Sequence, residues 1–358
     1  MSIETRKADH IKISLERDVS FKKSTWLEYV ELVHQAAPDF DPDEIDTSTV
    51  FLGEKFSHPF IIESMTGGTD LAEKINANLA EAAARFNIPM GVGSQRAGVV
   101  KPETAKTFRV ARDHAPDVFL IGNIGAAQLV EKGLDFAFQA VKMIDANALA
   151  IHLNPLQEIV QPDGEPKFKN FYKILKSLKK SLPVPIILKE IGCGLSREIV
   201  VAADRAGVDA FDVAGSGGTN WTLIEMIRSE ASQSTEKKSL AEVYLEWGIP
   251  TAAALIESVS VTSKPVIASG GLRTGLDSAK CIALGASMTG LARPFLGPAT
   301  QSSEQVLAVL SKLSNELKTA MYLTSSRTIK DLRRAPKVLM GPLSEWASQR
   351  IIRGRKRR

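Results

Sequence analysis

The chain alternates between short apolar runs and longer amphipathic stretches. Eight runs are rich in Ile, Val, Leu, Ala or Phe and lack long polar alternation, as is typical of strands buried on both faces of a parallel sheet. They recur at intervals of about 30 residues and are Pro59–Glu63, Ile88–Val92, Val118–Gly122, Ala148–Leu153, Pro185–Lys189, Val208–Val213, Pro265–Ser269 and Ala286–Gly290. Between them lie helical patterns such as Asp70–Arg85, Gln128–Ile144 and Ser196–Ala206.

Eight strand–helix units of this size predict an α/β fold, a closed (β/α)8 TIM barrel with an N-terminal arm and a C-terminal helical extension. A doubly wound sheet is the competing fold. It usually has fewer strands and a GxGxxG turn after the first strand, and that turn does not occur here.

The segments outside the barrel pattern divide the chain into three parts. Residues 1–57 are expected to form an arm or cap, with helical pieces around Thr25–Gln35. The barrel is expected over 58–319, closed by a helix from Ala299 to about Thr319, and the extension over 320–358. The polar stretch Arg228–Ser239 has the composition of a long, mobile loop.

Composition places the chain among ordinary globular proteins. It has 358 residues, of which 44% are hydrophobic and 24% charged. The sequence contains no apolar run long enough for a membrane span, and its polar start, MSIETRKADH, does not resemble a secretory signal. Two isolated cysteines, Cys193 and Cys281, favour a reducing cytoplasm over a disulfide framework.

The net charge of +4 comes from the end of the chain. Five of the 45 basic residues lie in Arg353–Arg358, so the rest nearly balances the 41 acidic residues. A nucleic-acid role would rest on this tail alone, and a solvated terminus is the preferred interpretation.

Active sites of TIM barrels lie where the strands end, and polar groups follow the first three runs. The Gly-Gly pair of Ser64–Thr69 fits a flat or anionic ligand or a tight turn equally well. Arg96 is suited to a phosphate. Asn123 fits either the edge of a heterocycle or a helix cap.

The fourth and fifth runs add further polar groups. His152 and Asn154 are two residues apart and share a face if the strand continues, and Glu158 is a plausible Mg²⁺ ligand. Lys189 ends a buried strand, which is costly unless an anion meets it. Snorkelling to the surface is the alternative, but a barrel interior leaves little room for it. A cation there would face the N1/O2 edge of a flavin.

The last three runs point to a phosphate. Trp221 and Glu225 share a face if their segment is helical; the alternative is a core tryptophan beside a solvated glutamate. The loops after runs seven and eight are the standard phosphate site of TIM barrels, and they carry glycines with Arg273 and Arg293. This pair predicts a cofactor that bears a phosphate.

Taken together, these segments resemble a known family. SMTGGT, GSQRA, HLNPLQE, GSGGTNW with its IE, ASGGLRTG and LARP occur in this order, after an N-terminal Arg6-Lys7-x-x-His10. The chain is similar to type 2 isopentenyl-diphosphate isomerases from residue 6 to about 295. HLNPLQE and GGTNWxxIE are specific to that family, whereas GGLRTG also occurs in FMN-dependent hydroxy-acid oxidases and IMP dehydrogenase.

The resemblance implies a tetramer of barrels, reduced FMN, Mg²⁺, NADPH or another reductant, and a small diphosphate substrate. FMN is expected on Ser64, Met65, Thr66, Ser94, Asn123, Lys189 and Thr219, with its phosphate on Gly271, Leu272, Arg273, Ala292 and Arg293. The substrate is expected on Arg6, Lys7, Ser94, Gln95, Arg96, His152, Asn154 and Gln157, with Mg²⁺ on Glu158.

The implied reaction moves a double bond by adding and removing a proton, without net redox change. An alkene is a poor base, so the acid must be strong and close to carbon. Reduced FMN beside Lys189 is expected to exchange that proton, with Trp221 facing the developing cation. Glu225, Gln157 and His152 are candidates for proton relay, and the sequence does not choose between them.

Two other FMN or barrel enzymes were considered. A 2-hydroxy-acid oxidase needs a histidine base near an arginine after a late strand, but no histidine follows His152. IMP dehydrogenase needs a nucleophilic cysteine in a Gly/Ser-rich loop, and neither Cys193 nor Cys281 is placed for that role.

Overall fold

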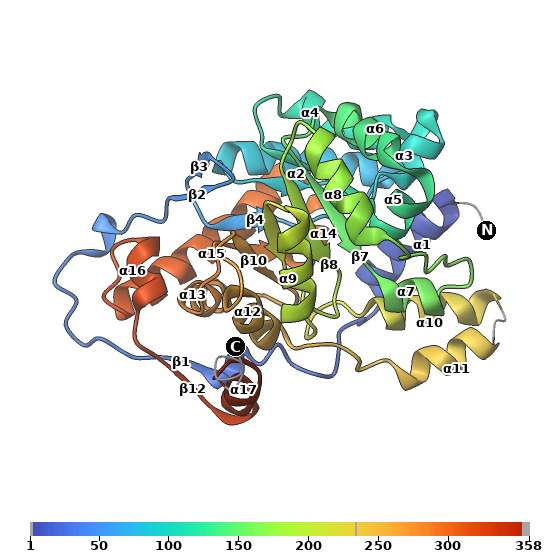
Figure 1. The fold of residues 1–358 in the computed structure, drawn as a ribbon. Helices are drawn as coiled ribbons and strands as arrows, with labels where there is room; N and C mark the ends of the chain where they lie inside the picture. Colours follow the sequence, from blue (N-terminus) through green and yellow to red (C-terminus); the bar gives the residue numbers. More distant parts are fainter. Residues whose placement is uncertain (1–2, 233–234, 353–358) are drawn as a thin grey trace.

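The expected barrel is confirmed. The computed structural model describes residues 3–232 and 235–352. Its closed parallel barrel has the strand order β10-β11-β4-β5-β6-β7-β8-β9 (Figure 1). Each expected run overlaps one strand, and β6, β8 and β11 extend past their runs: β4 (Phe60–Ile62), β5 (Met90–Gly91), β6 (Leu120–Gly125), β7 (Ala148–Leu153), β8 (Ile186–Glu190), β9 (Ala210–Asp212), β10 (Val266–Ser269) and β11 (Met288–Leu291).

Helices follow the barrel strands and surround the barrel (Figure 1). They are α2 (Asp70–Phe86), α3 (Arg96–Val100), α4 (Lys106–His114), α5 (Ala126–Lys132), α6 (Leu134–Ile144), α7 (Pro155–Val160), α8 (Phe171–Ser181), α9 (Arg197–Ala206), α12 (Thr251–Val259), α13 (Gly275–Ala283), α14 (Arg293–Ala299) and α15 (Ser303–Leu323). Thr69 and Ser196 begin α2 and α9 by accepting a backbone N–H. The helix expected over Gln128–Ile144 is two helices, because Gly133 breaks it with a φ of 79°.

One end of the barrel is sealed by apolar side chains. The antiparallel pair β2 (Thr49–Phe51) and β3 (Glu54–Phe56) brings Phe51 and Phe56 against the inner layer of the barrel. Phe56 meets Phe119 edge to face at 5.6 Å. The polar end of the barrel is therefore the opposite one, where the strands finish.

The N-terminal arm differs from its prediction. Thr25–Gln35 contains a 3-10 turn, Leu27–Tyr29, followed by strand β1 (Val30–Leu32) rather than helical pieces. β1 pairs with β12 (Lys337–Leu339) near the other end of the chain, a partner that local sequence does not reveal. A helix that was not expected, α1 (Ile3–Glu16), precedes this segment. Figure 1 shows α1 on the side of α7 and α10 (Trp221–Ser232), far from β1.

The prediction of a loop over Arg228–Ser239 is wrong. Helix α10 (Trp221–Ser232) extends into it, and α11 (Thr235–Val243) occupies the rest of its described part. Both helices contact α7, and Lys237 donates a hydrogen bond to the carbonyl of Ile159 at the end of α7. Glu, Lys, Ala and Ser are compatible with a helix once such packing is available, so composition alone misled the prediction.

The C-terminal extension docks onto the barrel helices. α15 continues to Leu323, past the expected boundary at 319, and is followed by α16 (Ile329–Arg334), β12, α17 (Gly341–Ala347) and a π-helical turn, Ser348–Ile352. Trp346 and Arg350 donate hydrogen bonds of 2.8 and 2.7 Å to Glu257, which is fully buried on α12. The division into three parts stays a prediction, and the basic tail Arg353–Arg358 lies outside the described residues.

Two further expectations concern the cysteines and the membrane. Cys193 and Cys281 are free thiols, so they form no disulfide with each other. Within residues 3–232 and 235–352, none of the helices combines the length and the apolar character needed to cross a bilayer.

Candidate active site

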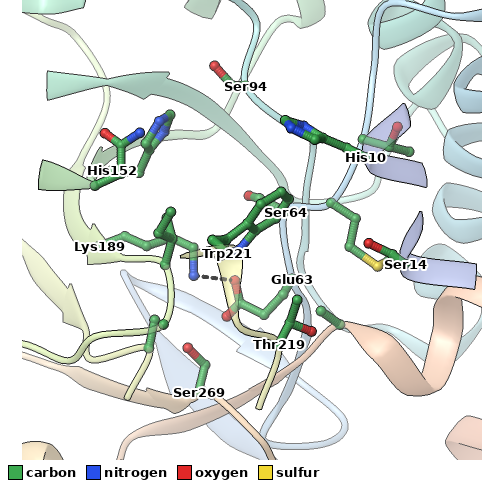
Figure 2. A pocket seen from close by; sticks show the side chains of 18 of the residues that line it. His10, Ser14, Glu63, Ser64, Ser94, His152, Lys189, Thr219, Trp221 and Ser269 are labelled. Atoms are coloured by element: carbon green, nitrogen blue, oxygen red, sulfur yellow. Dashed lines mark ion pairs between the residues drawn. The ribbon is translucent and has the colours of Figure 1, made fainter. Parts of the chain in front are cut away.

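A cavity opens at the polar end of the barrel and is roofed by α1 (Figure 2). In Figure 2, His10 and Ser14 enter from α1, and His152 and Lys189 face them from the opposite wall. Most residues named from the sequence line this cavity: Arg6, Lys7, Ser64, Met65, Thr66, Ser94, Arg96, Asn123, His152, Asn154, Gln157, Glu158, Lys189, Thr219, Trp221, Gly271, Leu272, Arg273, Ala292 and Arg293. Two named residues, Gln95 and Glu225, lie behind its wall.

Gln95 has a position that does not suit direct substrate contact. Its side chain is fully buried, its Nε2 donates to the carbonyl of Ala140 at 2.8 Å, and its Oε1 accepts from the backbone N–H of Asn123 at 2.9 Å. Both ends of the amide are therefore used inside the protein. In this arrangement Gln95 supports the strand that carries Asn123, and its expected contact with substrate stays a prediction.

The Gly-Gly pair after β4 is a packing turn. A Cβ on Gly67 would lie 1.9 Å from the Phe108 ring, and Gly68 has a φ of 87° and donates its N–H to Thr107 at 2.7 Å. Neither glycine lines the cavity, so the tight-turn interpretation is the better one. The three residues before the pair, Ser64, Met65 and Thr66, do line it.

Arg273 and Arg293 form a cationic end of the cavity after β10 and β11. Burial, followed by the charge of Arg293, lowers the pKa of Arg273, because two guanidinium groups share a partly desolvated space. Gly271, which also lines the cavity, has a φ of 83°, and a Cβ there would lie 2.5 Å from Thr25. Two cations beside a backbone that only glycine can form suit a phosphate group.

Arg293 also fastens the N-terminal arm to this end of the cavity. Its guanidinium donates to Ser20 Oγ at 2.9 Å and to the carbonyl of Arg17 at 3.2 Å. An isolated bridge between Ser20 and Thr219 continues this attachment, and Asn220 donates its backbone N–H to the carbonyl of Val19 at 2.7 Å. The roof helix α1 is thus anchored beside the Arg273–Arg293 end of the cavity.

Asn123 and His152 form one wall. Asn123 lies within β6 and its Oδ1 is 2.7 Å from His152 Nδ1 on β7, so it does not cap a helix. Burial, and then the charge of Lys7, lowers the pKa of His152 to about 3, so the ring is neutral at neutral pH. Thr66 contributes a buried hydroxyl with no partner among the described residues, and a polar ligand in the cavity would satisfy it.

Lys189 sits in a network of acids rather than at the surface. Its Nζ lies 2.9 Å from Glu63 Oε2 and 2.5 Å from Asp212 Oδ2, and Asp212 accepts a hydrogen bond from Ser269 at 2.5 Å. Snorkelling is therefore excluded for Lys189. The charge of Asp212, followed by that of Glu63, raises its pKa against the effect of burial, so the side chain is a cation.

A second cationic group lies beneath the roof helix. Arg6 and Lys7 on α1 face Arg96, the first residue of α3. Burial, and then the charges of Arg6 and Arg96, lowers the pKa of Lys7 to about 7. Such crowding of cations is unfavourable without an anion, so this end of the cavity is suited to a diphosphate.

Glu225 joins three elements behind the wall. It accepts hydrogen bonds from Gln157 Nε2 and His10 Nε2, each at 2.9 Å, and from Arg228 at 2.5 Å. These bonds outweigh burial and lower its pKa to about 2. Because α10 is helical, Trp221 lies on the same side and meets His10 edge to face at 5.2 Å. The shared face expected for Trp221 and Glu225 is confirmed.

Glu158 is a buried carboxylate that lines the cavity on the same side as Asn154 and Gln157. Its Oε1 accepts from Asn154 at 3.2 Å and its Oε2 accepts from the backbone N–H of Glu165 at 2.8 Å. Each oxygen keeps a lone pair for a metal ion. In the part of the chain that the structure describes, no three His, Cys, Asp or Glu side chains gather as a metal centre, so an ion here would need the ligand's oxygens as well.

Sequence reasoning missed Glu63, Asp212 and His10. Glu63 closes the first apolar run just as Lys189 closes the fifth, and Asp212 is an acid inside the sixth run. Because a buried carboxylate needs a partner, acidic residues in these apolar runs could have indicated a charged network inside the barrel. His10 belongs to a motif that was noted without a role.

Comparison with known proteins agrees with this geometry. Residues 130–338 match the family model described as FMN-dependent dehydrogenase. A mandelate oxidase crystal structure with (S)-2-phenylpropionate superposes with a TM-score of 0.64 at 18% identity, covering 94% of this chain and 97% of that chain. That likeness shows the fold alone. Fold, site and family model define a barrel of the FMN-dependent dehydrogenase class.

Curated relatives place the chain more narrowly. The isopentenyl-diphosphate delta-isomerase of Halobacterium salinarum is 48% identical over 97% of this chain and 96% of its own length. That of Thermococcus kodakarensis is 46% identical over 97% and 94%. The chain belongs to the isopentenyl-diphosphate delta-isomerase family.

Proposed function

We propose that this chain interconverts isopentenyl diphosphate and dimethylallyl diphosphate by an allylic proton shift that uses reduced FMN and Mg²⁺. The observation that carries the proposal is one cavity with two separate cationic ends. Arg273 and Arg293 suit the phosphate of a cofactor, and Arg6, Lys7 and Arg96 suit a diphosphate. The polar groups between them suit proton transfer.

The residues present fit FMN. The cationic end at Arg273 suits its phosphate, Thr66 offers a hydroxyl that no described residue contacts by a hydrogen bond, and the Lys189 ammonium lies on the cavity wall. When bound, reduced FMN supplies a proton-exchanging group that the side chains here do not offer. Ser64, Met65, Ser94, Asn123 and Thr219 would hold the rest of the cofactor.

The diphosphate end binds and orients the substrate. Arg6 and Arg96 donate charge-assisted hydrogen bonds, and an anion beside Lys7 raises the pKa of that lysine from about 7, so that it is fully charged in the complex. Mg²⁺ on Glu158 completes the neutralisation of the diphosphate. The roof helix α1 carries Arg6 and Lys7, so substrate binding and the exclusion of water from the cavity go together.

The reacting carbon end lies near Trp221, Gln157 and His10. The indole face stabilises positive charge that develops on the alkene. Gln157 and His10 both reach the Glu225 carboxylate, which can accept a proton through either of them. His152, held neutral by burial and bonded to Asn123, orients the site rather than delivering a proton.

A 2-hydroxy-acid oxidase is the alternative, and the site disfavours it. That chemistry needs a histidine base beside a carboxylate-binding arginine. No histidine follows His152 in the sequence, and the Arg273 end is assigned to the cofactor. A homotetramer, and NADPH or another external reductant, complete the proposal.

An anaerobic assay tests the proposal. The purified protein, loaded with FMN and reduced with dithionite, is mixed with isopentenyl diphosphate and Mg²⁺ and followed by proton NMR. Dimethylallyl diphosphate should accumulate towards equilibrium. Absence of product under these conditions, with the flavin bound and reduced, would refute the proposed function.

A further inference from the structure

The network around Lys189 holds one cation and two acids, all three buried, at the wall of the cavity. Lys189 and Asp212 are paired across β8 and β9, and Glu63 follows β4 on the other side of the barrel. Lys189, Asp212 and Glu63 are 7%, 2% and 6% exposed. Figure 2 shows the contact between Lys189 and Glu63 at the centre of the cavity.

The charges of this network do not balance. With both acids ionised, the three side chains carry a net charge of −1 in a desolvated site, which is costly. One proton on either acid leaves a neutral cluster. The geometry therefore favours a proton on one of the two carboxyl groups.

The two acids differ in where a proton can sit. Both oxygens of Asp212 are engaged, one by Lys189 and the other by Ser269. Glu63 uses Oε2 for Lys189, and its Oε1 is buried without a partner among the described residues. A Cβ on Gly290 would lie 1.9 Å from this Oε1, so the oxygen has its space only because residue 290 is glycine.

We propose that Glu63 is the proton-accepting partner of the flavin, taking up a proton when bound FMN is reduced and releasing it on oxidation. The idea rests on the proposed function, because it needs FMN beside Lys189. Two-electron reduction is then accompanied by one proton bound to the cofactor and a second bound to the Glu63 carboxylate. The electrons come from an external reductant such as dithionite.

Charge explains this coupling. The reduced cofactor is an anion beside Lys189, and an ionised Glu63 would compete with it for the same ammonium group. Burial, followed by the charge of Asp212, raises the pKa of Glu63 to about 7 against the effect of Lys189. A further anion in the cavity moves that pKa upwards. The charged groups that act on Glu63 are Lys189 on β8 and Asp212 on β9.

The direction of these pKa shifts sets the pH range in which Glu63 takes up a proton on flavin reduction. Below about pH 7, Glu63 is protonated with oxidised and reduced cofactor alike, and reduction takes up one proton. Above that pH, Glu63 is ionised beside oxidised FMN and protonated beside reduced FMN, so reduction takes up two. The midpoint potential should therefore depend more steeply on pH above neutrality than below it.

Spectroelectrochemical titration of the FMN-loaded protein between about pH 6 and about pH 9 measures this slope. Each proton taken up with two electrons changes the reduction equilibrium tenfold per pH unit, or about 30 mV. The slope should double above neutrality. Glu63→Gln should show the one-proton slope throughout. Glu190→Gln is the matched control, because Glu190 is also buried with a pKa raised to about 7 but contacts backbone N–H groups of 191–193.

Proton uptake by the parent protein provides a readout without any variant. In weakly buffered solution with an indicator dye, reduction at an electrode, which supplies electrons without protons, should consume two protons per FMN at about pH 8 and one at about pH 6. A one-proton slope in the parent, or a two-proton slope retained in Glu63→Gln, would overturn the assignment. Loss of isomerase activity with the steep slope intact would instead refute the proposed function and leave this inference standing.

Discussion

Gln157 lines the cavity and donates a hydrogen bond of 2.9 Å to Glu225, a carboxylate with no exposed surface. The bond joins α7 to α10, and His10 adds a second route from α1 to the same oxygen. Glu225 therefore acts on the cavity through its neighbours. Because three elements depend on it, its removal should affect both catalysis and stability.

Glu225→Gln should lower kcat by about 100-fold, the range expected for loss of a general acid–base group, with a smaller change in KM. It also leaves the Arg228 guanidinium beside a neutral amide, which should cost about 3 kcal/mol in the free energy of unfolding. Steady-state kinetics and urea unfolding measure the two effects. Glu198→Gln, a change to an exposed acid paired with Arg350, should alter stability by less than about 1 kcal/mol. An unchanged kcat in Glu225→Gln would remove Glu225 from the proton path.

Arg273→Ala should weaken FMN binding at least about tenfold, because a charge-assisted hydrogen bond to phosphate is worth about 1.5–3 kcal/mol. Quenching of flavin fluorescence measures the affinity. Riboflavin, which lacks the phosphate, is the matched ligand, and its affinity should stay the same in the variant. An equal loss for both ligands would mean that Arg273 supports the cavity without contacting phosphate.

Glu158→Gln should keep FMN bound but require far more Mg²⁺, with KM raised, since the amide is a weaker ligand for a hard cation. Activity measured against Mg²⁺ concentration tests this. Glu165→Gln is the neighbouring control, because Glu165 contacts Arg96 at 3.8 Å and should leave the Mg²⁺ dependence unchanged. The parent's Mg²⁺ dependence in Glu158→Gln would assign this residue to the structure of its loop.

His58 should make stability depend on pH. Burial lowers its pKa to about 4, so the folded chain favours the neutral ring. The neutral ring therefore contributes fully to the free energy of unfolding above the ordinary histidine pKa. This contribution is lost as the pH falls from there towards 4. Unfolding in urea at about pH 7 and about pH 5 should show a smaller difference for His58→Phe than for the parent. The exposed His34→Phe should behave like the parent, and an identical difference in His58→Phe would exclude this role.

Much of the fold was predictable because buried parallel strands leave apolar runs in the sequence. The ends of those runs also located most cavity residues, since a barrel collects the strand ends at one mouth. Pairings between distant segments were not predictable. Nothing near Val30–Leu32 indicates its partner at Lys337–Leu339, and the helix α11 depends on packing against α7.

Most residues of the site were predictable from the sequence, but their hydrogen-bond and ion-pair partners were not. Lys189 was expected to need an anion, yet the closed barrel supplies two, Asp212 from the next strand and Glu63 from the end of β4 across the barrel. Gln95 belongs to a recognisable motif, but only the structure shows that both ends of its amide are used internally. A motif indicates which residues matter, and the fold decides which of them the ligand meets.

The central claim is that a flavin site performs a reaction without net redox change. The direct measurement compares the amount of dimethylallyl diphosphate formed with the amount of NADPH oxidised in one anaerobic experiment with isopentenyl diphosphate and Mg²⁺. We expect the oxidised protein to be inactive, and the reduced protein to form many molecules of product for each molecule of NADPH consumed. Oxidation of one NADPH per product molecule, or full activity with oxidised FMN, would contradict the account.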